Sequence, residues 1–208
     1  MTDERGGGLP AAATWGLLAA WAVHDGEELL TMSGWAERAL PRLRERFPQV
    51  PDQVWDRLRV TPAQAAIAIG AMGGLVATAS ARGAATGGRS RLYQAVLAGF
   101  GLHSITHVAQ AVATRGYTPG VVTAPLVVAP FSLWAWRRLR EAGVPTDGGG
   151  SAVWALLALP AAAGACHAVA RRLAPARPRR ARPPSSTGGD GSSPGGRCPS
   201  PPGPSPRP

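Results

Sequence analysis

The chain has 208 residues, is 45% hydrophobic and carries a formal net charge of +10, with arginine as its only strongly basic residue type. A positive charge of this size is one mark of nucleic-acid-binding proteins. However, 8 of the 22 arginines lie at or beyond Arg171 and aromatic residues make up only 6%, so we expect no nucleic-acid partner. The two cysteines, Cys166 and Cys198, suggest neither a disulfide framework nor a CxxC metal site.

Five apolar segments follow one another along the first 170 residues. They cover residues 9–23, 63–81, 92–114, 118–136 and 151–170. Each is close to the ~20 residues that a helix needs to cross a bilayer, although the first is short unless it continues past residue 23. Because backbone groups in lipid must be hydrogen-bonded internally, spans of this length should be helical. The sequence therefore predicts an all-α, polytopic membrane bundle of about five transmembrane helices over residues 1–170.

Prolines are expected to interrupt or kink two stretches of the chain. The linker at 34–61 holds six arginines and four acids, and Pro41 is among the prolines expected to break it up. Within the linker, "WAERALPRLRERF" looks like an amphipathic helix lying at the membrane surface. Pro125 and Pro130 are expected to kink the fourth apolar segment.

The arginines predict the topology of the chain in the membrane. With the N-terminus outside, the cytoplasmic ends and loops collect 15 arginines against 7 on the outer side. The positive-inside rule then favours a multi-pass plasma-membrane protein with its N-terminus out and its C-terminus in. Residues 171–208 lack any apolar set that could form a core, so we expect a disordered basic, Pro-rich tail. Membrane lipids are the expected partners, and a homo-oligomer stays open.

Ionisable residues meet the end of the first apolar segment in "AAWAVHDGEELLTM". His24, Glu27 and Glu28 stand at i, i+3 and i+4, so they share one face of a helix. Asp25 lies off that face and is expected to be solvated. The face continues backwards through small residues, which let another helix approach closely. These are Ala13, Gly16 and Ala20.

A second polar stripe follows the third apolar segment. His103, His107, Gln110 and Thr114 stand at i, i+4, i+7 and i+11 on a span that is otherwise largely apolar. Two histidines one helical turn apart have a spacing that can chelate one metal ion. His167, near the end of the fifth segment, is a lone histidine and predicts little by itself.

An up-and-down bundle would bring the two polar groups together, because its odd-numbered helices run in the same direction. We predict that His24, Glu28, His103 and His107 bind one divalent metal, Zn or Fe, with Glu27 as a catalytic base or a further ligand. Ionisable groups inside spans are usually functional. The alternative is structural: histidines can simply bond across helices, and the two glutamates can face the lipid headgroups.

The "GYTPG" stretch at 116–120 is expected to make the turn between the third and fourth segments. Thr118 is a plausible N-cap, Pro119 fits the first helical position and Tyr117 fits the water interface. A structural role explains most of this stretch.

These residues resemble a known family. "HDGEE" at 24–28 is similar to the signature of the HXXEE-motif family of bacterial integral membrane proteins, "YTPG" at 117–120 matches its YXPG motif, and His103 or His107 can supply its further histidine. The resemblance covers residues from about 9 to about 140. It implies a membrane location and a set of site residues, but no reaction.

Several functions fit this residue set. The first is a metal-dependent membrane enzyme that hydrolyses or oxidises a lipid or another apolar substrate. The second is a proton- or ion-coupled transporter, because intramembrane Glu and His are typical of proton relays. A haem-associated protein and a purely structural membrane protein are the others. The sequence specifies neither the substrate nor the metal.

Overall fold

The computed structural model describes residues 9–146 and 150–175, and over these residues the chain is helical and contains no strand. This confirms the all-α class. The elements are α1 (Ala11–Arg46), α2 (Asp52–Arg57), α3 (Pro62–Ala85), α4 (Arg91–Thr114), the π-helix η1 (Ala124–Val128), α5 (Ala129–Glu141) and α6 (Gly150–Leu173). The predicted boundary at residue 170 lies three residues before the end of α6. The rest of the predicted tail, from residue 176, lies outside the described residues.

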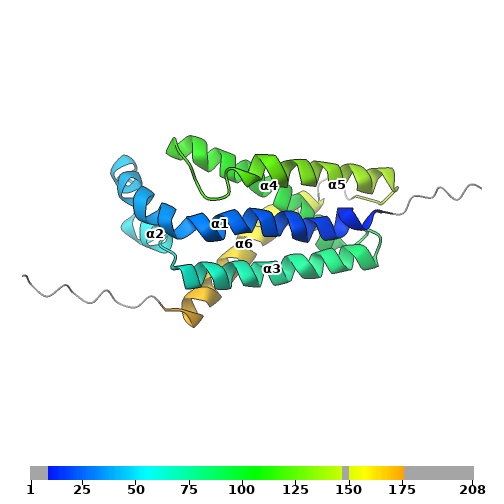
Figure 1. The fold of residues 1–208 in the computed structure, drawn as a ribbon, viewed down its shortest axis with the longest axis horizontal. Helices are drawn as coiled ribbons and strands as arrows, with labels where there is room; N and C mark the ends of the chain where they lie inside the picture. The colour runs from blue at the N-terminus through cyan, green and yellow to red at the C-terminus, as the bar shows by residue number, and fades with distance from the viewer. Residues whose placement is uncertain (1–8, 147–149, 176–208) are drawn as a thin grey trace, which may run out of the picture. The chain divides into compact units, whose positions relative to one another are not determined.

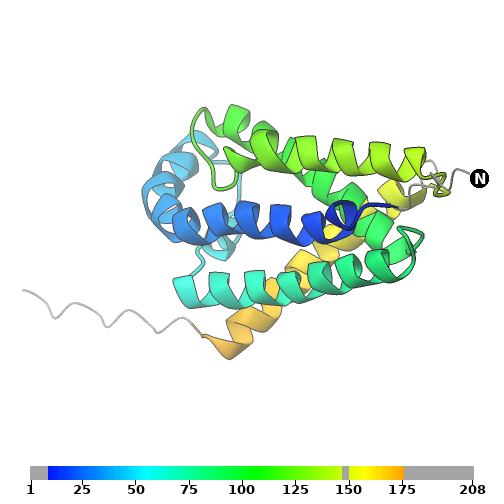
Figure 2. The ribbon, with the colours of Figure 1, turned by 45° about the vertical axis from the view of Figure 1, so that its right-hand side comes forward.

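The long helices lie side by side and alternate in direction (Figures 1 and 2). α1 packs against α3 and α5, and α6 packs against both α3 and α4. A short connection, residues 86–90, joins α3 to α4, so these two helices are antiparallel neighbours. As a result α1 and α4 run in the same direction, as the up-and-down plan requires (Figure 1).

Local signals explain where α3 and α4 begin. Thr61 caps α3: its hydroxyl accepts the backbone N–H of Gln64, whose side chain accepts the backbone N–H of Thr61 in return, and Pro62 fits the first position. Ser90 caps α4 with its hydroxyl, which accepts the backbone N–H of Tyr93. Both helices match the second and third predicted segments to within a few residues.

α1 differs from its prediction. It continues without interruption through the His/Glu cluster and through Pro41, and it ends at Arg46. The expected break at Pro41 is therefore wrong. The last turns of α1 turn away from the axis of its first part (Figure 1) and form a separate apolar cluster with α2. This cluster buries Leu40, Leu43 and Trp55, and that burial offsets the hydrogen bond that proline removes from the helix.

The fourth predicted segment is divided into two elements. A turn and the π-helix η1 occupy its first part, and α5 begins only at Ala129. Pro130 cannot donate a backbone hydrogen bond, and proline is a common site of such departures from regular α-helix. The predicted N-cap at Thr118 is wrong, because the N–H of Val121 bonds back to the Thr118 carbonyl in a turn and the helical backbone starts later.

Small residues allow the helices to approach closely. A Cβ on Gly16 would lie 2.7 Å from the Phe131 ring of α5, and one on Gly73 of α3 would lie 2.6 Å from the Trp21 ring. Ala13 is buried, and its carbonyl accepts the hydroxyl of Tyr93 from α4. The predicted small-residue face of α1 therefore does meet neighbouring helices.

Two of the described helices, α3 and α4, are long and apolar enough to cross a membrane. α5 has only 13 residues, because η1 takes the first part of its segment. α1 includes Asp25, Glu27 and Glu28 within the length that a span would need. Among the described residues, fewer helices than the five predicted have the length and composition of a span.

Candidate metal centre

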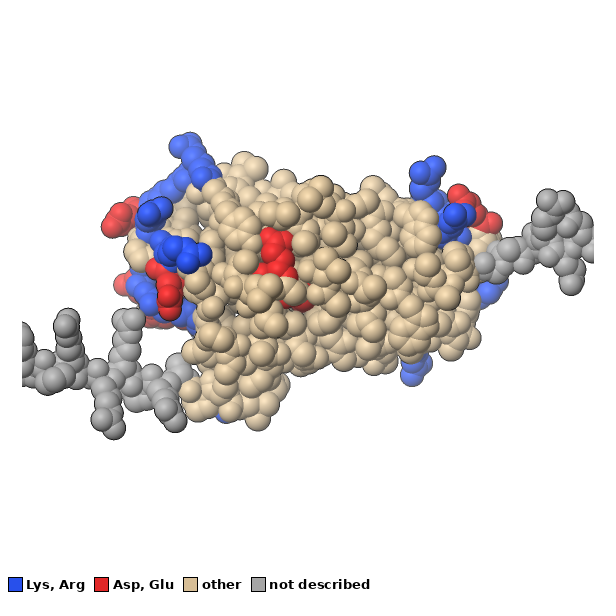
Figure 3. Space-filling view, viewed as in Figure 1, with Lys and Arg blue, Asp and Glu red and all other residues tan. Residues whose placement is uncertain are grey.

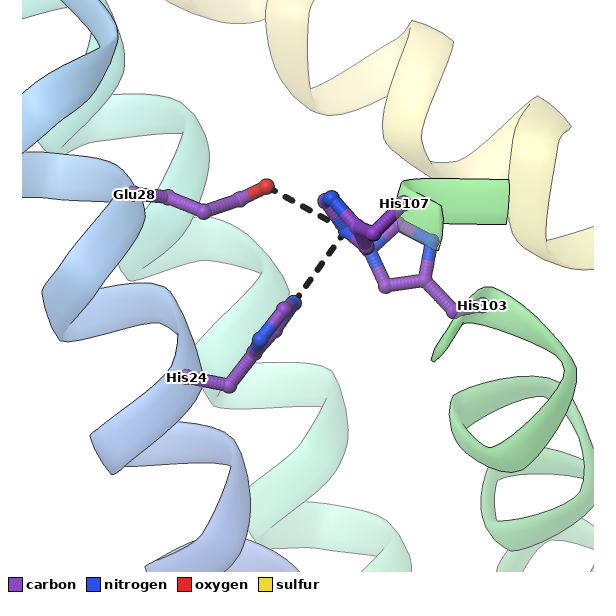
Figure 4. A group of neighbouring side chains, drawn as sticks. All are labelled: His24, Glu28, His103 and His107. Carbon is purple, nitrogen blue, oxygen red and sulfur yellow. Dashed lines mark hydrogen bonds and ion pairs between the residues drawn. The ribbon is translucent and has the colours of Figure 1, made fainter. Parts of the chain in front are cut away.

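Four of the predicted site residues come together between α1 and α4. One ligand atom from each of His24, Glu28, His103 and His107 lies within 4.8 Å of every other, so this group can hold a metal ion. His24 and Glu28 extend from α1 towards the two imidazoles of α4 (Figure 4). His24 is fully buried and His107 is 3% exposed, whereas His103 lies at the accessible edge of the group.

The separations around Nε2 of His107 are close to those of a tetrahedral metal site. Ligand bonds of about 2.0–2.1 Å at tetrahedral angles place neighbouring ligand atoms about 3.3 Å apart. Nε2 of His24 lies 3.3 Å from Nε2 of His107, and Oε1 of Glu28 lies 3.4 Å from the same nitrogen. The Nε2 atoms of His103 and His107 are 2.8 Å apart, a hydrogen-bond distance that has to widen slightly when both bind a metal.

The hydrogen-bond network fixes which ring nitrogens are free. Nδ1 of His107 lies 2.8 Å from the carbonyl oxygen of Pro119 and must donate to it, because a carbonyl only accepts. Nδ1 of His24 lies 2.8 Å from the hydroxyl oxygen of Thr123, whose own proton goes to Glu27. Both Nε2 atoms therefore point a lone pair at the cluster. Two lone pairs at 3.3 Å with a carboxylate beside them favour a bound cation at this point.

Glu27 faces the turn and not the cluster. Its Oε1 accepts the hydroxyl of Tyr117 at 2.6 Å, and its Oε2 accepts the hydroxyl and the backbone N–H of Thr123 at 2.7 and 2.9 Å. The backbone N–H of Val122 also donates to Oε1. These donors favour the ionised carboxylate, and burial together with the hydrogen bond to Glu27 raises the pKa of Tyr117. The carboxylate thus reaches His24 only through Thr123.

The comparisons with known proteins identify the family at this point. The model of a family described as "Protein of unknown function with HXXEE motif" matches residues 15–135, more than half of the chain. The chain belongs to this HXXEE family. No match was found among curated proteins or among solved structures.

The HXXEE motif supplies two different parts of the centre. Its histidine, His24, and its second glutamate, Glu28, contribute atoms to the cluster. Its first glutamate, Glu27, anchors the turn that covers the cluster. Since neighbouring residues on a helix point about 100° apart, two adjacent glutamates can serve two sides of one site.

The YTPG turn covers the cluster on a side that neither α1 nor α4 covers. Gly120 has φ +81°, a conformation that favours glycine, and a Cβ there would lie 2.7 Å from the His107 ring and 2.8 Å from the His24 ring. The motif thus does more than connect two helices. Sequence reasoning missed Thr123, Pro119 and Gly120 as supports of the centre, although the YXPG resemblance pointed to this stretch.

Two other sequence predictions need comment. Asp25, expected to be solvated, is only 9% exposed. α1 is covered on more than one side, and Asp25 follows Trp21 by one turn on the side that packs against α3. His167 on α6 is half-buried and is not in the metal-ligand group found among the described residues.

Proposed function

We propose that this HXXEE protein is a membrane enzyme that depends on a divalent metal held by His24, Glu28, His103 and His107 and acts on a lipid or another apolar substrate. The observation that carries the proposal is the convergence of the lone pairs of two buried imidazoles and a carboxylate on one point. Such a group of acceptors is costly to bury without a cation. Three histidines and one carboxylate suit Zn or Fe.

The residues around that metal have different roles. Thr123 and the Pro119 carbonyl hold the two buried imidazoles in the tautomer that binds metal. Glu27 keeps Thr123 in place and is a positioning residue in this proposal, which replaces the catalytic role first expected for it. His103 lies at the accessible edge, where a substrate can approach. A bound divalent ion would polarise a substrate oxygen as a Lewis acid.

The distribution of charge supports a membrane location. Arginines and acids gather at the two ends of the helical unit, and the face shown in Figure 3 carries only one patch of acidic atoms between them. Large apolar side chains are exposed on several of the helices, as expected for a surface in contact with lipid. Examples are Leu30, Ile105, Val112, Leu126 and Leu133. We propose a multi-pass protein with its N-terminus outside and its C-terminus inside.

The same geometry weakens the alternatives. A haem held by histidines on two helices needs room for the porphyrin between the imidazoles, and the 3.3 Å between His24 and His107 leaves none. A proton-coupled transporter would need alternating access, which is typically built on internal repeats, and the sequence shows no such repeat.

Metal analysis tests the proposal directly. The full chain, purified in a mild detergent and incubated with Zn²⁺ or, without oxygen, with Fe²⁺, should retain about one equivalent after free metal is removed. His103→Ala should lower the retained metal strongly, because it removes one of four ligands from an accessible position. His167→Ala, on a histidine outside the cluster, is the matched control and should retain the wild-type amount. A wild-type chain that retains neither metal overturns the proposal.

A further inference from the structure

A cavity of about 390 Å³ adjoins the candidate metal centre, bounded by α1, α3, α4 and α6. This volume falls within the range of small-molecule binding sites. Most of its wall is apolar, and the largest side chains in it are Trp21, Met72, Phe100 and Leu159. Such a wall favours an apolar chain over a polar molecule.

His103 connects the cavity to the cluster. It lines the cavity and also contributes one of the four clustered ligand atoms. Whatever fills the cavity therefore lies against the proposed metal ligands, on the side where they are accessible.

One acidic side chain in the cavity wall has no polar partner among the described residues. Asp25 is 9% exposed, and no described residue donates a hydrogen bond to its carboxyl group or forms an ion pair with it. No arginine lines the cavity; Thr106 and Gln110 are the other polar residues there besides His103. Because Asp25 lines the cavity, a ligand that brings a donor can supply a hydrogen bond that no described residue gives it.

We propose that the cavity binds a single-chain amphiphile whose head group donates hydrogen bonds, a long-chain primary amine or alcohol, with Asp25 accepting from the head group. The chain lies among Trp21, Met72 and Phe100, and the head group lies at the end of the cavity that holds Asp25 and His103. The amine and the alcohol can each donate a hydrogen bond to Asp25. This inference deepens the proposed function, because it names the substrate class of the same centre.

Binding of labelled dodecylamine and dodecan-1-ol to the metal-treated full chain in lipid nanodiscs tests the assignment, with empty nanodiscs giving the background. Dodecanoate, whose ionised head group cannot donate, is the mismatched probe. We expect saturable binding of at least one of the two donor probes and none of dodecanoate. The probe that binds more tightly shows whether the preferred head group is an amine or an alcohol.

Three variants locate the site. Asp25→Asn should weaken binding of the preferred probe by about 10-fold or more, the loss expected for a hydrogen bond to a charged group. Ala163→Phe places a ring into the cavity from α6 and should abolish saturable binding while leaving the carboxyl group intact. Glu37→Gln, the same loss of one charge at an exposed position of α1, should have no effect.

The assignment is overturned if neither donor probe binds saturably, if dodecanoate binds equally well, or if binding survives both Asp25→Asn and Ala163→Phe. Metal content measured in the same samples separates the two proposals. Saturable amphiphile binding by a chain that holds no metal contradicts the metalloenzyme and keeps the cavity assignment. A metal-loaded chain that binds none of the probes contradicts only the cavity assignment.

Discussion

The middle and the C-terminal end of α1 hold charged side chains in different ways. In the middle of the helix, His24 and Glu28 point into the bundle, where hydrogen bonds turn the Nε2 atoms of His24 and His107 towards each other. Near the C-terminal end, Arg44 pairs with Asp52 at 3.5 Å and with Asp56 at 2.7 Å, and the two carboxylates are largely exposed. The charges at the C-terminal end are already paired with one another, whereas the acceptors in the middle of the helix favour a bound cation. One helix therefore carries both a site and an ordinary charged surface, and burial distinguishes them.

The largest expected effect comes from Gly120→Ala. It combines a left-handed backbone conformation with a Cβ less than 3 Å from both buried imidazoles. We expect a loss of about 2 kcal/mol or more in the free energy of unfolding, and loss of metal binding, measured by thermal unfolding in detergent and by metal analysis.

Two other glycines separate the causes. Gly143→Ala has a similar positive φ of +62° with nothing within 4 Å of the added atom, and Gly116→Ala has neither feature. Both should retain metal. If Gly143→Ala loses metal as Gly120→Ala does, contact with the imidazoles is not the reason.

Metal removal should have the next largest effect. A ligand that binds only the folded state at 100 times its Kd adds about 2.7 kcal/mol, so a chelator should lower the thermal midpoint of the wild-type chain. His103→Ala, which binds metal weakly, should show little response to the chelator. An identical response in the two proteins would place the stabilising metal somewhere other than this cluster.

Glu27→Gln should weaken metal binding without removing a ligand. An amide cannot accept all four of the hydrogen bonds that the turn donates to Glu27, so Thr123 and His24 lose part of their support. Supporting residues of this kind typically contribute about 10- to 100-fold in metal affinity. A competition titration against a chelator of known affinity measures it, with Glu37→Gln as the control. Unchanged affinity would show that the turn does not hold the histidine.

The smallest effect is expected at the far end of α1. Asp56→Asn removes an ion pair with Arg44, but the carboxyl side chain is 65% exposed and water replaces its partner. The free energy of unfolding should change by less than about 1 kcal/mol, and metal content should not change. A change in metal content would mean that the two ends of α1 are coupled.

Much of the fold was predictable because α3 and α4 have clear capping residues and uninterrupted apolar sequences, which lead to helices in any context. The continuation of α1 through Pro41 was not predictable in the same way. It depends on burial of Leu40, Leu43 and Trp55 against α2, and these contacts join residues from two elements. The place where the fourth segment becomes helical was likewise not predictable, because the turn at Gly120 packs against the two imidazoles and takes up its first residues.

The sequence by itself determined the types of residue available to a site and their spacing along α1 and α4, since helical periodicity fixes which side chains share a face. Tertiary structure decided what each one does. Neighbouring residues on a helix point in different directions, so only the packing of α1 against the turn and α4 sends Glu27 to Thr123 and Glu28 to His107. The same packing buries Asp25 in the wall of a cavity, because α3 covers the side of α1 that the pattern alone left to solvent.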